Sequence, residues 1–171
     1  MKLSIKEITL FGLLGALMYA SKVAMQFLPN IHLIGTFIVA TTVVFRKKAL
    51  YPIYVYVFLE GLFGGFTAWW VPYLYVWAVL WGAVMLLPKN MPEKIKPVVY
   101  AVVCSLHGFL FGTLFAPAQA ILFHLDFKGM LGWIAAGLPF DVTHGIGNLI
   151  LGMLIMPLVS ILKRARKSMN R

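Results

Sequence analysis

The sequence predicts an all-α membrane protein, a bundle of six transmembrane helices with both termini on the cytoplasmic side (N-in/C-in). Three observations predict this class: an apolar composition, six separate apolar segments, and basic residues that gather in alternate connections. Of the 171 residues, 61% are hydrophobic and 12% are charged, whereas a soluble domain is about half apolar and about a quarter charged. The length suits a single integral membrane domain, residues 1–171, with five or six spans of about 20 residues each.

We expect the first span at about residues 8–28, where an apolar run ends at a Pro-Asn pair. The second run, about 31–45, is short, so it is either extended by its flanks or lies where the bilayer is thinned. The other runs predict spans at about 49–66, 70–87, 97–123 and 141–162. Pro139 predicts a helix break before the last span, and Asp141 is expected to be its N-cap.

Basic residues orient the predicted bundle. They precede the first span, lie between spans two and three and between spans four and five, and follow the sixth, whereas the other three connections hold only Lys128. Because cytoplasmic connections carry an excess of lysine and arginine, this alternation predicts six spans with both termini inside. Membrane orientation also explains the net charge of +10 better than a nucleic-acid surface does, since the basic residues are dispersed among apolar spans.

Three polar residues share one face of the predicted sixth span. Asp141, His144 and Asn148 recur at helical spacing. Two interpretations stay open: contact with a solute near the extracellular end, or an N-cap with interhelical hydrogen bonds. Asn30 and His32 lie in the first outer connection, where they either help to enclose the same solute or are simply solvated.

Two charges and an aromatic series also lie inside the apolar spans. Lys22 and Glu60 are expected to form an ion pair beside a pocket, with an ion relay or the recognition of a charged substrate as the alternative. Trp70 and Tyr73 begin an aromatic series at helical spacing in the fourth span. This series is either a stacking wall for a planar ligand or a packing and interfacial surface.

A stripe of small residues follows one face of the first span. Ala16, Ala20 and Ala24 recur every fourth residue, and such a stripe lets a second helix approach closely in lipid. Similar stripes in spans three and five mean that this pattern alone does not identify an external partner. No catalytic residue, cofactor or metal site is expected, because a single cysteine excludes a cysteine-based metal site and Asp141 with His144 makes only a weak one.

Several stretches, taken in order, resemble the substrate-binding S components of energy-coupling factor (ECF) transporters. Residues 16–20, Ala-Leu-Met-Tyr-Ala, resemble the AxxxA motif of the first helix in that family. Residues 28–33, 51–61 and 137–148 resemble further segments of one branch of it, so the similarity covers essentially the whole chain. AxxxA alone is a weak motif, and the specificity comes from the ordered co-occurrence of the segments.

The resemblance implies the substrate-specificity subunit of an ECF-type ABC importer in the bacterial cell membrane. Such a subunit binds a vitamin or related micronutrient at the extracellular side and delivers it with a transmembrane coupling subunit and two ATPase subunits. Ala16 and Ala20 match the docking motif for the coupling subunit, and Ala24 extends it. The family's binding regions, the outer loops and spans four to six, correspond here to Asn30, His32, Trp70, Tyr73, Asp141, His144 and Asn148. No residue decides which micronutrient is bound.

The residues leave two other functions open. A stand-alone ion-coupled transporter of small solutes would use Lys22, Glu60 and Asp141 as its relay. A small intramembrane enzyme would place Asp141 and His144 in its site. The chain has no Walker A motif, so as an importer subunit it would depend on partner ATPases.

Overall fold

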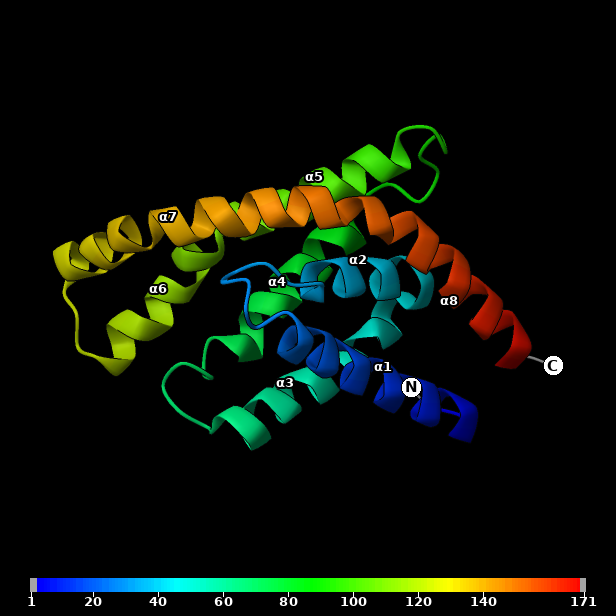
Figure 1. Cartoon of the computed structure of the whole chain (residues 1–171), viewed down its shortest axis with the longest axis horizontal. Helices are drawn as coiled ribbons and strands as arrows, with labels where there is room; N and C mark the ends of the chain where they lie inside the picture. Colours follow the sequence, from blue (N-terminus) through cyan, green and yellow to red (C-terminus); the bar gives the residue numbers. More distant parts are fainter. Residues whose placement is uncertain (1–2, 170–171) are drawn as a thin grey trace.

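The computed structural model describes residues 3–169, and every regular element in this range is helical. Figure 1 shows the helices and their order along the chain. The helices are α1 (Ile5–Ala24), α2 (Ile34–Phe45), α3 (Leu50–Gly64), α4 (Tyr73–Leu86), α5 (Lys96–Phe109), α6 (Phe111–Leu122), α7 (Phe127–Leu151) and α8 (Ile155–Met169). Two 3-10 turns, Arg46–Ala49 and Gly152–Leu154, join α2 to α3 and α7 to α8.

Three helical stretches are long and apolar enough to cross a membrane: Ile5–Ala24, Lys96–Leu122 and Phe127–Met169. Within residues 3–169 the helices form five stretches and not the six expected, because a 3-10 turn joins α2 to α3 without a non-helical residue. The chain changes direction in this turn at Arg46, whose φ is 54° and ψ is −121°. The all-helical class is therefore confirmed, whereas the count of six crossings stays a prediction.

The short second segment is the central helix of the bundle. Every residue of α2 except Val43 is buried. As a helix of 12 residues, α2 is about 18 Å long, which is less than the hydrocarbon thickness of about 30 Å. Because other helices surround it, its ends need not reach the lipid headgroups, and its backbone groups can be satisfied within protein.

Two bent stretches, α5–α6 and α7–α8, lie along one another in Figure 1. Glycines allow this approach: a Cβ atom on Gly108 would lie 2.9 Å from the backbone of Gly145. Two hydrogen bonds join α5 to α7: one of 2.8 Å from Ser105 Oγ to Gly145 O, and one of 3.1 Å from Asn148 Nδ2 to Cys104 O. The small-residue stripe of the predicted fifth span therefore packs inside the bundle.

The expected start of the sixth span is wrong. Pro139 lies inside α7, which begins at Phe127, and the N-cap is Asp126, whose side chain accepts a hydrogen bond of 2.7 Å from Gly129 N. Proline removes one helical hydrogen bond, but the outer half of α7 is held by this cap and by packing on α6. Asp141 is thus a mid-helix residue and caps nothing in its own helix.

Basic segments that are distant in sequence gather at one end of the molecule, the basic end. Lys48 pairs with Glu7, Arg46 Nη2 donates to Met85 O, and Arg166 Nη1 donates to Val44 O. Both ends of the described chain also lie there, with the α2–α3 turn and the α4–α5 connection (Figure 1). The opposite end, the pocket end, carries the connections 25–33, 65–72 and 123–126.

Candidate functional site

A cavity of about 470 Å³ lies at the pocket end, between the first two of these connections and helices α4, α6 and α7. This volume falls within the range of about 300–1,000 Å³ that is usual for small-molecule sites. The lining is mostly aromatic and carries few polar groups: Asn30, Trp69, Tyr73, Phe111, Gly112, Phe115, Trp133, Ala136, Gly137, Phe140 and Asp141. Asn30, Tyr73 and Asp141 were expected from the sequence to contact a solute, and the structure brings them to one cavity.

Helix α7 supplies one wall of the cavity. Trp133, Gly137 and Asp141 recur every fourth residue, and Ala136 and Phe140 flank them on the same face. The sequence shows this periodicity, but the expected break at Pro139 divided it between the connection before the sixth span and the span itself. Trp133 was missed for that reason.

The carboxylate of Asp141 caps a neighbouring helix. Its Oδ1 accepts a hydrogen bond of 2.9 Å from the backbone N–H of Gly112, at the start of α6. The first N–H groups of a helix have no partner within the helix, and a negative charge near them is stabilising. The other oxygen, Oδ2, is buried and has no hydrogen-bond partner among residues 3–169.

Beneath the cavity lies a second group of polar side chains, the inner cluster, made of His32, Trp77, His107 and His144. The rings of His32 and His144 are 4.8 Å apart between centroids, and those of Trp77 and His107 are 5.6 Å apart. Phe111 contacts both His144 and Trp77 and also lines the cavity, so it lies between the cavity and the inner cluster.

The inner cluster has unused hydrogen-bonding capacity. Within the described range, His32 Nδ1, Trp77 Nε1, His107 Nδ1 and His144 Nε2 are all buried without a partner. Buried polar atoms are nearly always hydrogen-bonded, and leaving one unsatisfied costs about 1–3 kcal/mol. These unpaired groups therefore favour a polar site in which water or the polar part of a solute supplies the missing hydrogen bonds.

Lys22 and Glu60 form an ion pair between α1 and α3. Both side chains are mostly buried, and the Lys22 Nζ also lies 5.4 Å from the centroid of the Tyr73 ring. Since Tyr73 lines the cavity, the pair lies behind this side chain, and neither Lys22 nor Glu60 is in the cavity lining. The two opposite charges balance each other there.

Four of the seven expected solute contacts are not in the cavity lining: His32, Trp70, His144 and Asn148. Trp70 donates from Nε1 to Val57 O at 2.8 Å and packs against Phe66, so it holds the α3–α4 connection while the neighbouring Trp69 lines the cavity. Asn148 donates to Cys104 O and joins α7 to α5. His144 lies in the inner cluster and not in the cavity lining.

The small stripe of α1 faces outward. Ala16, Ala20 and Ala24 are exposed, and a Cβ atom on Gly12 would meet nothing within 4 Å. The other face of α1 packs on α3, where a Cβ atom on Gly15 would lie 2.5 Å from Val55 Cγ1. The outward stripe thus has no packing partner within residues 3–169.

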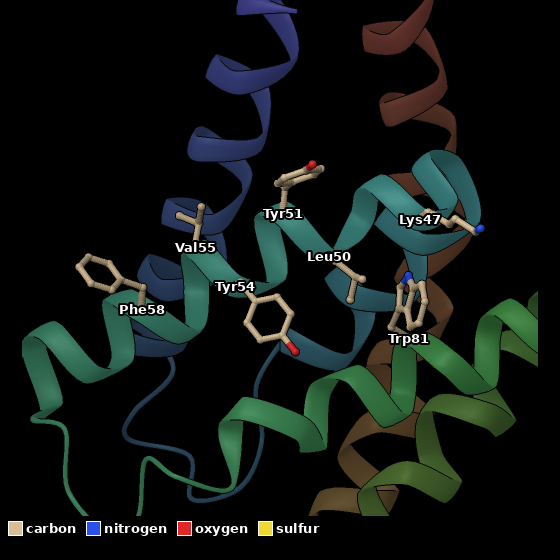
Figure 2. Close-up of a pocket in the computed structure, with 7 residues that line it drawn as sticks. All are labelled: Lys47, Leu50, Tyr51, Tyr54, Val55, Phe58 and Trp81. Atoms are coloured by element: carbon tan, nitrogen blue, oxygen red, sulfur yellow. The ribbon is translucent and has the colours of Figure 1, made fainter. Parts of the chain in front are cut away.

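A larger hollow of about 720 Å³ lies on the outside of the bundle between α3 and α4. Figure 2 shows Tyr54 directed toward α4, with Leu50, Lys47 and Trp81 near one end and Phe58 at the other. The Tyr54 hydroxyl already donates to Leu74 O, at 2.9 Å, and most of the lining is apolar. This hollow suits hydrocarbon, and the smaller cavity with its carboxylate is the better solute site.

No family model, curated protein or solved structure matches the chain. Within the described residues, no group of three or more His, Cys, Asp or Glu side chains is placed to hold a metal ion. The functional assignment therefore depends on the sequence pattern and on the geometry of the cavity and helix faces.

Proposed function

We propose that this chain is the substrate-specificity (S) component of an ECF-type ABC importer for a vitamin or related micronutrient. The observation that carries the proposal is the outward stripe of α1, in which Ala16, Ala20 and Ala24 are exposed. By contrast, Gly108, Gly112 and Ala116, which form the similar small-residue stripe of α5 and α6, are buried. A small-residue face left open toward lipid supports docking of another membrane helix, and this face coincides with the segment that resembles the AxxxA motif.

In the proposed topology the chain crosses the bacterial plasma membrane six times. The crossings are α1, α2, α3, α4, the bent α5–α6 and the bent α7–α8. The basic end is then cytoplasmic, as the excess of lysine and arginine favours, and the pocket end faces outward. Both termini are cytoplasmic in this arrangement.

The proposed solute site is the cavity at the pocket end, together with the inner cluster. Asn30, Tyr73 and Asp141 contact the solute from the cavity wall, and His32 and His144 offer their unpaired nitrogens beneath it. The separate coupling subunit docks on the α1 stripe, and its two ATPases supply the energy for release inside. This subunit itself binds and delivers the solute and catalyses no reaction.

The test begins with mass spectrometry of the solute that co-purifies with the full chain. Uptake of that solute is then measured in proteoliposomes that contain the chain with or without a coupling subunit and ATPases. Uptake that requires both the ATPases and ATP is expected. Uptake driven by an ion gradient without these partners would instead support the stand-alone transporter, with Lys22, Glu60 and Asp141 as its relay.

A further inference from the structure

Three aromatic rings from separate parts of the chain surround one side of the cavity. They are Trp69 in the α3–α4 connection, Phe115 in α6 and Trp133 in α7. The ring centroids are 6.2 Å apart for Trp69 and Phe115, and 6.4 Å apart for each of the other two pairs. The interplanar angles are 37° and 39° for the two pairs with Trp69 and 2° for Phe115 and Trp133. We call this group the aromatic cage, because an aromatic face attracts a positive charge that comes within about 6 Å of its centroid.

The lining of the same cavity includes a carboxylate, Asp141, one of whose oxygens has no hydrogen-bond partner among residues 3–169. Asp141 is only 5% exposed, its Oδ1 is held by the N–H of Gly112, and its Oδ2 has no partner among residues 3–169. This carboxylate lies directly against Gly112, since a Cβ atom there would be 2.5 Å from Oδ2. A buried charge of this kind is normally paired or hydrogen-bonded.

Asp141 decides the sign of charge that the cavity favours. Lys22, behind Tyr73, is neutralised by Glu60, and Lys128 does not line the cavity. Within residues 3–169, Asp141 is the one Asp, Glu, Lys, Arg or His side chain in the cavity lining. The balance therefore favours a cation over an anion or a neutral molecule of the same shape.

A bare metal ion does not fit this lining. Calcium takes six to eight oxygen ligands, and magnesium usually retains several waters. The cavity lining is mostly aromatic and offers few oxygens. An organic cation carries its own apolar groups, so it can lose water against the rings and still keep its charge near Asp141.

We propose that the cavity binds an organic cation, a quaternary or protonated amine on an apolar or aromatic body, with its charge between the aromatic cage and Asp141. The inference rests on the proposed function in one respect, that this cavity is the importer's solute site. It adds the chemical class of that solute, which neither the resemblance nor the sequence decides.

The test compares two probes that differ in charge and not in shape: 4-(trimethylammonio)phenol and 4-tert-butylphenol. Each is titrated by calorimetry into the full chain in lipid nanodiscs. The cation is expected to bind at least about tenfold more tightly than its neutral isostere. Asp141→Asn should reduce the affinity for the cation by about tenfold or more and leave that for the neutral probe within about twofold, because asparagine can still accept the Gly112 hydrogen bond.

A second variant tests the cage without disturbing the core. Trp69 is 61% exposed, so Trp69→Leu should fold normally. It should weaken binding of the cation severalfold more than binding of the neutral probe. Equal affinity for the two probes, no binding of the cation at millimolar concentration, or unchanged selectivity in both variants would overturn the proposal.

The two proposals fail in different ways. If uptake of the native solute depends on the ATPases but the charge preference is absent, the importer stands and the cation class is wrong. If the cation preference is present but transport proceeds without the ATPases, only the importer is wrong.

Discussion

At the scale of single residues, Asp141 links the fold to the proposed site. One of its oxygens caps α6, and the other is buried beside the cavity without a hydrogen-bond partner among residues 3–169. The sequence identified Asp141 as polar and functional but assigned its capping role to the wrong helix. A capping interaction between two residues that are 29 positions apart depends on tertiary packing, which local patterns do not contain.

Gly112→Ala tests this arrangement. The new Cβ atom would lie 2.5 Å from Asp141 Oδ2 and 3.0 Å from Oδ1, so the carboxylate must move and its hydrogen bond to the α6 backbone is lost. We expect affinity for the co-purifying solute to fall by about tenfold or more, since hydrogen bonds to charged groups contribute about 1.5–3 kcal/mol. Gly137→Ala is the matched control, because it lines the same cavity and its Cβ atom would meet nothing within 4 Å. Equal effects of the two variants on calorimetric affinity would contradict the role of Asp141.

The Lys22–Glu60 pair gives a second prediction at this scale. Glu60→Gln leaves the Lys22 ammonium unpaired in a largely apolar setting, and it should lower the free energy of unfolding by about 3 kcal/mol. The double variant Lys22→Met/Glu60→Gln should recover much of this loss, because no unpaired charge remains. Thermal unfolding monitored by circular dichroism in detergent measures both. A double variant that folds and binds solute but no longer transports it would favour the ion relay.

At the scale of elements, α1 presents two faces with different tasks. Gly15 lies against α3, whereas Ala16 and Ala20 are exposed. Ala16→Leu should therefore abolish ATPase-dependent uptake and leave the affinity of the isolated chain within about twofold, because added bulk prevents close helix docking. Ala135→Leu, at an exposed alanine of α7, adds the same volume away from α1 and should leave uptake intact. Loss of both uptake and affinity in Ala16→Leu, or of neither, would count against the docking face.

The helices show which features local sequence determines. The apolar runs located α1 to α4, and α5 together with α6, within a few residues, since each run depends on its own composition and end signals. The rules for proline failed at α7, because packing on α6 and the cap at Asp126 outweighed one lost hydrogen bond. The outer half of α7, with Trp133, was consequently left outside the predicted sixth span.

The cavity itself was only partly accessible to prediction. Asn30, Tyr73 and Asp141 stood out as polar groups in apolar surroundings, and the structure places them together. The aromatic cage did not stand out, because its rings come from three separate elements and each resembles ordinary packing when viewed alone. Which of two adjacent tryptophans faces the cavity depends on the path of the α3–α4 connection, and the sequence favoured Trp70 over Trp69.

At the scale of the whole molecule, the proposal depends most on membrane topology. It requires the basic end to face the cytoplasm and the pocket end to face outward. The critical element is α4, whose 14 residues extend about 21 Å as a helix, against a hydrocarbon thickness of about 30 Å. If α4 crosses, the connections before and after it must lie on opposite sides of the membrane. A local thinning of the bilayer or the flanking turns would then supply the remaining length.

Single cysteines test this crossing directly. In a Cys104→Ala background, we expect Thr67→Cys to react with a membrane-impermeant maleimide in intact cells. Lys47→Cys and Lys94→Cys should react only after permeabilisation. All three native side chains are exposed, so an absence of labelling reflects sidedness and not burial. Labelling of positions 67 and 94 from the same side would remove α4 as a crossing, whereas a fully reversed pattern would place the cavity at the cytoplasmic face, where an importer could not capture its solute.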